Sequence, residues 1–304
     1  MTTLVDLIVV LGMFVVVPTG LALIDEPGLR RLRRHWFVAA TAGAVALWLP
    51  RGAAATALAS AYALATLALA LHAPRRLART RSLAPGEIAV LTALVTPAVA
   101  GTALVAERSG HQLFGFDLQI LSLTVPHFHF AGFAAALVAG LVCRAARPGR
   151  AGPLAALSVP VGALLVLAGY FVDDWAELAG AVVLTAGMWL VALVTWRDLR
   201  TTTPDRTTRT LLGVSAAVLV ATMLLALSWA LGEATGLPHP TLAWMAATHG
   251  LGNALGFALC ALLAWRRLRD EAATHSPAPS VPAPGPTATA TATATATKEA
   301  GTPA

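Results

Sequence analysis

Nine long apolar segments constrain this chain more than any other feature of its sequence. They cover roughly residues 4–24, 36–50, 53–72, 87–106, 118–143, 152–171, 178–196, 211–232 and 243–265. Most of them reach the roughly 20 residues with which a helix crosses a hydrocarbon core, and 36–50 falls short. Because lipid offers no partner to open backbone groups, such segments must be helical. The sequence predicts an all-α fold, with a polytopic bundle of about nine transmembrane helices over residues 1–270.

The composition agrees with a membrane protein. The chain is 57% hydrophobic and only 12% charged, with a mean hydropathy of +0.72, whereas a soluble domain has about 25% charged residues. The isoelectric point near 10.6 would indicate nucleic-acid binding only if the basic residues clustered on one soluble face. Here they lie in short loops, so we expect a multi-pass protein of the cell membrane, with lipid and not nucleic acid as its partner.

The arginines predict the orientation of the bundle. Short cytoplasmic loops accumulate Lys and Arg, and 18 arginines fall on alternate connections, whereas only Arg51 and Arg108 lie on the others. We therefore expect the N-terminus outside and the C-terminus inside. The 18 arginines are Arg30, Arg31, Arg33, Arg34, Arg75, Arg76, Arg79, Arg81, Arg144, Arg147, Arg150, Arg197, Arg200, Arg206, Arg209, Arg266, Arg267 and Arg269.

The two ends of the chain differ in character. The first apolar segment has no basic region before it and no small-residue cleavage site, which indicates a retained helix. Residues 271–304 are rich in Pro, Ala and Thr and hold few large apolar side chains, so we expect a disordered cytoplasmic tail. The two cysteines, Cys143 and Cys260, lie inside apolar segments, where neither a structural disulfide nor a zinc site is expected.

Histidines interrupt two apolar segments. In LTVPHFHFAGF, residues 123–133, His127 follows Asp117 by ten residues, or about 15 Å of helix, which puts it near the membrane midplane. His127 and His129 should point about 200° apart unless Pro126 loosens the turn. In THGLGNALGF, residues 248–257, His249 and Asn253 share one helix face. Such groups are costly in lipid and usually face the bundle interior or a wet cavity, so we expect these two helices to face each other.

Carboxylates and aromatic residues gather near the predicted outer helix ends. In YFVDDWAEL, residues 170–178, Asp173 and Glu177 are spaced i, i+4, and Asp174, Glu233 and His239 belong to the same layer. Simpler interpretations are a solvated loop and an interfacial aromatic belt. We select as candidate catalytic residues Asp117, His127, His129, Asp173, Glu177, His249 and Asn253, and as candidate substrate-binding residues Phe128, Phe130, Phe133, Tyr170, Phe171, Trp175, Trp229 and Trp244.

Three resemblances bear on these motifs. The pair LTVPHFHFAGF and THGLGNALGF resembles the YndJ-like family of bacterial membrane proteins, which implies a polytopic fold and supports the histidine site without naming a reaction. The stretch HFH is similar to the H-x-H of heme-copper oxidases, but this sequence departs from their pattern, since those enzymes use more membrane histidines than the three found here. A single bis-histidine heme, for example between His129 and His249, stays open as an alternative. DDWAE resembles the aspartate-rich motif that holds Mg²⁺ and diphosphate in soluble prenyl-transferring enzymes.

Four functions remain open at this point. An acid-catalysed terpenoid or isoprenoid cyclase, isomerase or lyase would act on a lipophilic substrate without a cofactor, using an acid and aromatic faces; small membrane cyclases of actinobacterial and fungal pathways are similar in size and polarity. A redox protein would hold heme or a metal on the histidines. A small-solute or proton-coupled transporter would use them as a relay. A structural subunit would not need this concentration of polar groups.

Overall fold

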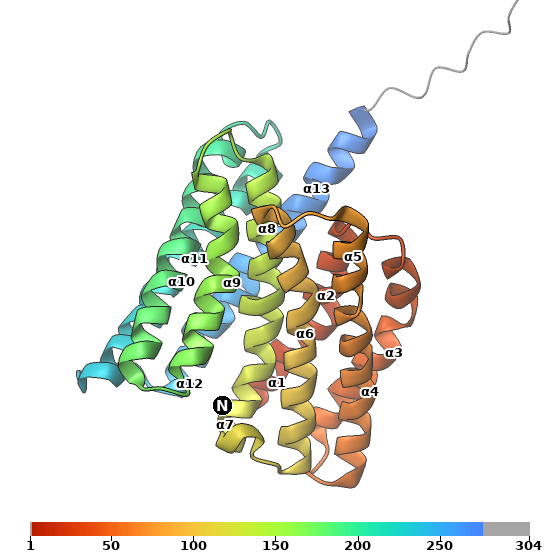
Figure 1. The fold of residues 1–304 in the computed structure, drawn as a ribbon, viewed down its shortest axis with the longest axis vertical. Coiled ribbons are helices and arrows are strands. Elements are labelled where there is room, and N and C mark those ends of the chain that lie inside the picture. Colours follow the sequence, from red (N-terminus) through yellow and green to blue (C-terminus); the bar gives the residue numbers. More distant parts are fainter. Residues whose placement is uncertain (1, 276–304) are drawn as a thin grey trace, which may run out of the picture.

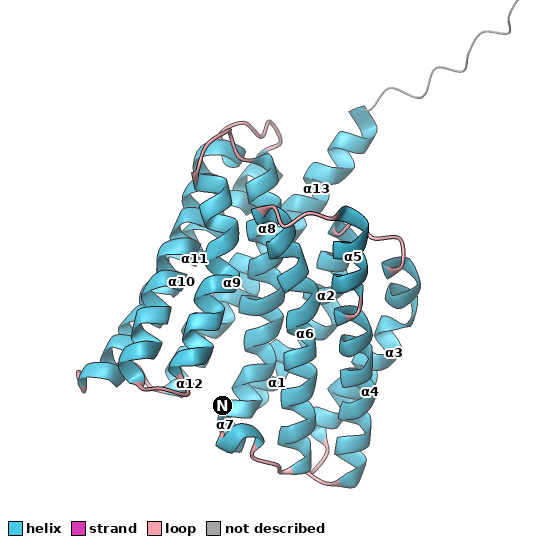
Figure 2. Cartoon of the chain, viewed as in Figure 1, coloured by secondary structure: helices cyan, strands magenta, loops and turns pink. Residues whose placement is uncertain are grey.

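The apolar segments form long helices that run alternately up and down in one bundle (Figure 1). The computed structural model describes residues 2–275, which contain no strand (Figure 2). The elements are α1 (Thr2–Leu11), η1 (Gly12–Val16), α2 (Val17–Leu23), α3 (Leu29–Trp48), α4 (Ala53–Ala70), α5 (His72–Thr80), α6 (Pro85–Ser109), η2 (Leu113–Gly115), α7 (Leu118–His127), η3 (Phe128–Ala134), α8 (Ala135–Ala145), α9 (Ala151–Gly169), α10 (Asp174–Val194), η4 (Thr195–Arg200), α11 (Arg206–Thr235), α12 (Leu242–Met245), η5 (Ala246–Gly250), η6 (Gly252–Leu259) and α13 (Cys260–His275).

The predicted membrane bundle is confirmed. Eight helical stretches within residues 2–275 are long and apolar enough to cross a membrane, close to the predicted nine. The remaining segment, predicted at 36–50, is the second half of α3, a 20-residue helix whose first turns carry four arginines. At about 1.5 Å per residue α3 is about 30 Å long, and it packs against α4.

The predicted boundary at residue 270 falls inside a helix. α13 continues to His275 and extends beyond the rest of the bundle (Figure 1). Residues 276–304, which make up most of the predicted tail, lie outside the described residues.

Arginines and carboxylates pair at one end of the bundle. The connections 24–28, 81–84, 146–150 and 201–205 meet there (top of Figure 1), and we call it the arginine-rich end. Glu87 binds the buried Arg76 through two hydrogen bonds of 2.8 and 2.9 Å, and Asp198 pairs with Arg197 at 2.7 Å. The sequence indicated only the arginines of these connections, and the structure adds their carboxylate partners.

The opposite end holds fewer basic groups. The connections 49–52, 110–117, 170–173 and 236–241 lie here, together with the start of α1 (Figure 1), and we call it the arginine-poor end. Arg51 and Arg108 both pair with Glu107, which is 2% exposed. Arg51 and Arg108, the two arginines that lie outside the alternating set of basic connections, thus share one buried carboxylate.

Short polar side chains begin several of the helices. Asp117 and Asp173 act as N-caps, accepting hydrogen bonds from the N–H groups of Ile120 and Ala176 at 2.9 and 2.8 Å. Such caps satisfy N–H groups that have no partner within the helix. One oxygen of each of these two predicted catalytic carboxylates is therefore engaged by the backbone.

Four wide, π-helical segments interrupt the helices near the bundle centre. η1 contacts both η3 and η6, η3 contacts η6, and η5 adjoins η6 in the last helix. Pro18 and Pro126 flank η1 and η3, and each withdraws an N–H from the regular hydrogen-bond ladder. π-helical turns are rare and often occur at functional sites, and two of these segments carry His129 and His249.

Candidate functional site

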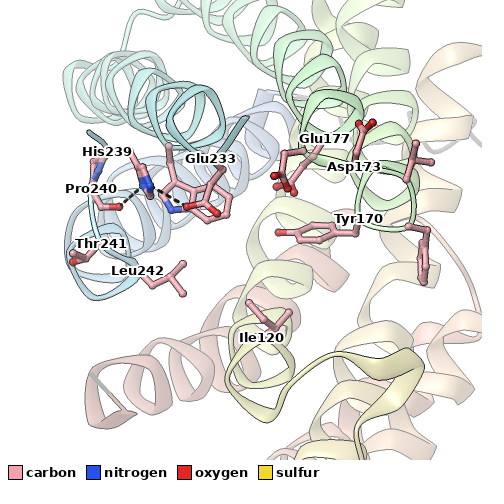
Figure 3. A pocket seen from close by; sticks show the side chains of 14 residues that line it. Ile120, Tyr170, Asp173, Glu177, Glu233, His239, Pro240, Thr241 and Leu242 are labelled. Carbon is pink, nitrogen blue, oxygen red and sulfur yellow. Dashed lines mark hydrogen bonds and ion pairs between the residues drawn. The ribbon is translucent and has the colours of Figure 1, made fainter. Parts of the chain in front are cut away.

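A pocket of about 380 Å³ opens at the arginine-poor end. The turn between α9 and α10 forms one wall, the end of α11 and the start of α12 form the opposite wall, and α7 contributes Ile120 (Figure 3). Five predicted site residues line it, namely Tyr170, Phe171, Asp173, Glu177 and Trp229. Glu233 and His239, which the sequence placed in this layer without assigning them to the site, also line it.

Glu177 is the most deeply buried carboxylate of the pocket, at 8% exposure. It forms a hydrogen bond with the Tyr170 hydroxyl, and desolvation raises the pKa of that tyrosine well above its usual value. Tyr170 therefore remains protonated and donates. A carboxyl group with so little access to water is buried at lower cost in its neutral form, which is the form that carries a transferable proton.

A glycine sets the position of Glu177. A Cβ atom on Gly169 would lie 2.4 Å from both the Cα and the backbone N of Glu177, closer than non-bonded atoms approach. Only glycine therefore lets the end of α9 pack this closely on the first turn of α10. This close approach fixes the Glu177 side chain at the pocket wall.

Glu233 and His239 form an ion pair on the facing wall (Figure 3). His239 Nε2 lies 3.1 Å from Glu233 Oε1, and Nδ1 lies 3.2 Å from the carbonyl oxygen of Pro240. A carbonyl only accepts, so Nδ1 carries a proton, and Nε2 is the nitrogen that faces the carboxylate. The pocket thus has a buried carboxyl on one side and an imidazole–carboxylate pair on the other.

The charge of the pocket favours positive ligands. Four carboxylates line it, from Asp173, Asp174, Glu177 and Glu233, against the single imidazole of His239. An anionic diphosphate would be repelled unless cations bridged it, and residues 2–275 contain no group of three side chains arranged to hold a metal ion.

His249 and Asn253 belong to a closed hydrogen-bond ring deeper in the bundle. His249 Nδ1 donates to the Thr222 carbonyl at 2.7 Å, Asn253 Nδ2 donates to His249 Nε2 at 3.1 Å, and the Thr222 hydroxyl donates to Asn253 Oδ1 at 2.7 Å. The ring fixes a neutral imidazole and engages both of its nitrogens. In this arrangement His249 positions the last helix against α11 and has no lone pair left for a substrate.

His129 is held in a different place, among fully buried aromatic residues. Its Nε2 lies 2.5 Å from the Tyr62 hydroxyl, Gly12 packs against its ring, and Trp36 meets Tyr62 edge-on at 5.7 Å while donating to the Met13 carbonyl. Sequence reasoning missed Tyr62 and Trp36. A usable signal was Tyr62 itself, because a buried phenol in the middle of an apolar segment needs a hydrogen-bond partner.

His127 points away from His129, as its spacing suggested. It is exposed and lies close enough to His249 to interact with it electrostatically. Its ring meets Phe128 edge-on at 5.7 Å and forms no hydrogen bond with any described residue. The structure therefore brings His127 toward His249, whereas the predicted heme ligands His129 and His249 are each engaged by other partners.

The remaining predicted residues lie outside the pocket. Asp117 is exposed and caps α7. Trp175 and Trp244 are 61% and 48% exposed, which fits the interfacial belt that was the simpler interpretation. Phe130 and Phe133 are core residues.

The fold and these polar groups define a polytopic helical membrane protein with a polar pocket at its arginine-poor end and hydrogen-bonded histidines inside the bundle. The model of a family described as YndJ-like protein matches residues 7–257. The chain belongs to the YndJ-like family. No curated protein and no solved structure matches it.

Proposed function

We propose that the pocket is the active site of a membrane enzyme that performs acid-catalysed isomerisation or cyclisation of a lipophilic, unsaturated substrate. The observation that carries this proposal is the placement of Glu177 on one wall and the Glu233–His239 pair on the other (Figure 3). A double-bond shift needs one group that gives a proton and a second that removes one from a neighbouring carbon. Two such groups face each other across this pocket.

The reaction balances without a cofactor or a co-substrate. The Glu177 O–H protonates one carbon of a double bond, which leaves a positive charge on the adjacent carbon. The pocket carboxylates and the faces of Trp229 and Tyr170 stabilise that charge. The Glu233–His239 pair then removes a proton from a neighbouring C–H bond, and the electron pair of that bond forms the new double bond. For cyclisation, a second double bond of the same molecule attacks the cation before the proton leaves.

Several features support a substrate delivered by the bilayer. The helices that form the pocket walls are apolar enough to span a membrane, and aromatic side chains lie around the pocket mouth, where Phe116 meets Tyr170 and Phe171 edge-on or tilted at 5.9 and 5.6 Å. We further propose that the arginine-rich end faces the cytoplasm of a cell membrane, because short basic loops are retained there. The pocket then opens toward the outer interface.

Transfer of solvent hydrogen to carbon tests this function. Membranes that contain the protein are incubated in D₂O with a panel of unsaturated lipophilic alcohols and hydrocarbons, and the extracted compounds are examined by mass spectrometry. The expected result is deuterium bound to carbon in a substrate or its isomer, because the proton from Glu177 exchanges with solvent between turnovers. Equal deuterium content in membranes with and without the protein contradicts the proposal.

A further inference from the structure

We propose that the pocket continues inward to His127, and that His127 binds the hydroxyl group of an elongated lipophilic alcohol whose double bond lies beside Glu177. This inference rests on the proposed function and specifies its substrate class. Its starting point is that His127 is exposed and lies near His249 of the last helix. A side chain that is exposed next to a second helix of the bundle can line a crevice between the two helices.

Two helices lead from the pocket to His127 and its neighbours. Ile120 lines the pocket, and His127 follows it by seven residues on α7. Trp229 also lines the pocket, and Thr222, which binds His249, precedes it by seven residues on α11. Seven residues are about two helical turns, so each pair shares a helix face and is separated by about 10 Å along the axis. The same faces of α7 and α11 thus border the pocket and the deep histidines.

The three histidines inside the bundle, His127, His129 and His249, differ in how many of their ring nitrogens form hydrogen bonds with the protein. His249 uses both nitrogens in its ring with Thr222 and Asn253, and Tyr62 engages His129. His127 alone among them forms no hydrogen bond with a described residue, so both of its nitrogens remain to bind a ligand. A neutral imidazole has one donor and one acceptor, which match the single O–H and the lone pairs of an alcohol.

The neighbours of His127 favour an uncharged ligand group. Phe128 lies against its ring, and the nearby His249 is held neutral by its partners. No carboxylate of the pocket reaches this depth along α7 or α11, whereas four carboxylates line the pocket about two turns away. An uncharged alcohol at His127 would therefore be bound by neutral hydrogen-bonding groups. A positive charge that develops near the pocket would be stabilised by the carboxylates.

Accessibility of an introduced cysteine tests the crevice directly. Thr124 lies one turn from His127, on the same face of α7 as Ile120. In a protein whose native Cys143 and Cys260 are replaced by Ala, Thr124→Cys is reconstituted in proteoliposomes and treated with a small water-soluble thiol reagent. We expect reaction from the arginine-poor end, and about tenfold slower reaction when Ile120→Trp narrows the pocket. His129→Cys, at a buried position, should not react.

Ligand protection tests the alcohol. Dodecan-1-ol should slow labelling of Thr124→Cys by about tenfold, and n-dodecane should not. Adding His127→Leu should remove the protection, whereas His127→Gln, which keeps a donor and an acceptor, should retain it. Equal protection with Leu at position 127, or a Thr124→Cys that does not react, overturns the inference. Glu177→Gln separates the two proposals, since it should keep the protection, and protection without deuterium transfer would contradict only the chemical step.

Discussion

Glu177→Gln is expected to reduce deuterium transfer to the substrate by about 10³-fold while leaving the fold and substrate binding intact. Glutamine has the shape of glutamic acid and still accepts a hydrogen bond from Tyr170, but it has no proton to give. Rates are measured by mass spectrometry in membranes that contain matched amounts of wild-type and variant protein. Binding is followed in parallel by protection from labelling in Thr124→Cys proteins with and without Glu177→Gln.

Asp117→Asn is the matched control for this substitution. Asp117 was a candidate acid from the sequence, but it is exposed and caps α7, and asparagine is an equally good N-cap. Its variant should transfer deuterium at the wild-type rate. If Asp117→Asn abolished transfer and Glu177→Gln did not, the assignment of the proton donor would be wrong.

Gly169→Ala is expected to cost about 3 kcal/mol of stability and to abolish activity. The added Cβ would lie 2.4 Å from two backbone atoms of Glu177, and backbone cannot move aside as a flexible side chain does. The ends of α9 and α10 must therefore separate, which displaces Glu177 from the pocket wall. The measurement is the thermal unfolding midpoint of the detergent-purified protein together with its folded yield.

Gly250→Ala provides the comparison for the glycine substitution. A Cβ at Gly250 would meet its nearest neighbour, Ile8, at 3.8 Å, which is ordinary contact. Alanine also favours a helix over glycine by roughly 0.5–1 kcal/mol, so the midpoint should be unchanged or higher. A Gly169→Ala variant as stable and active as Gly250→Ala would show that the close helix approach does not position the site.

The lengths of the apolar segments supplied most of the fold prediction. The length of each apolar segment alone located the membrane helices, because a segment in lipid can pair its backbone groups only by forming a helix. It did not locate α3 accurately, since four arginines at the start of that helix lower its average hydropathy. It also did not reveal the π-helical segments, whose extra residue per turn depends on how η1, η3 and η6 pack together in three dimensions.

The site was harder to predict than the fold. The sequence predicted Tyr170, Glu177 and Trp229 as site residues, and all three line the pocket. They could be predicted because charged and aromatic residues near the ends of apolar segments can be recognised from the sequence alone. It joined them to all of the deep histidines as one site, whereas His129 belongs with Tyr62 and His249 with Thr222. Such pairings join residues 27 to 67 positions apart, and no local pattern specifies them.

Photolabelling tests most directly whether the pocket holds the substrate. A lipophilic alcohol that carries a diazirine is irradiated with the protein in lipid nanodiscs, and the adducts are located by peptide mass spectrometry. The expected adducts lie on Ile120, Tyr170, Trp229 and Leu242, on the walls of the pocket, and excess unlabelled alcohol should remove them. Adducts confined to a lipid-accessible groove such as that beside Leu64 and Leu67 of α4, with no competition, would contradict the account.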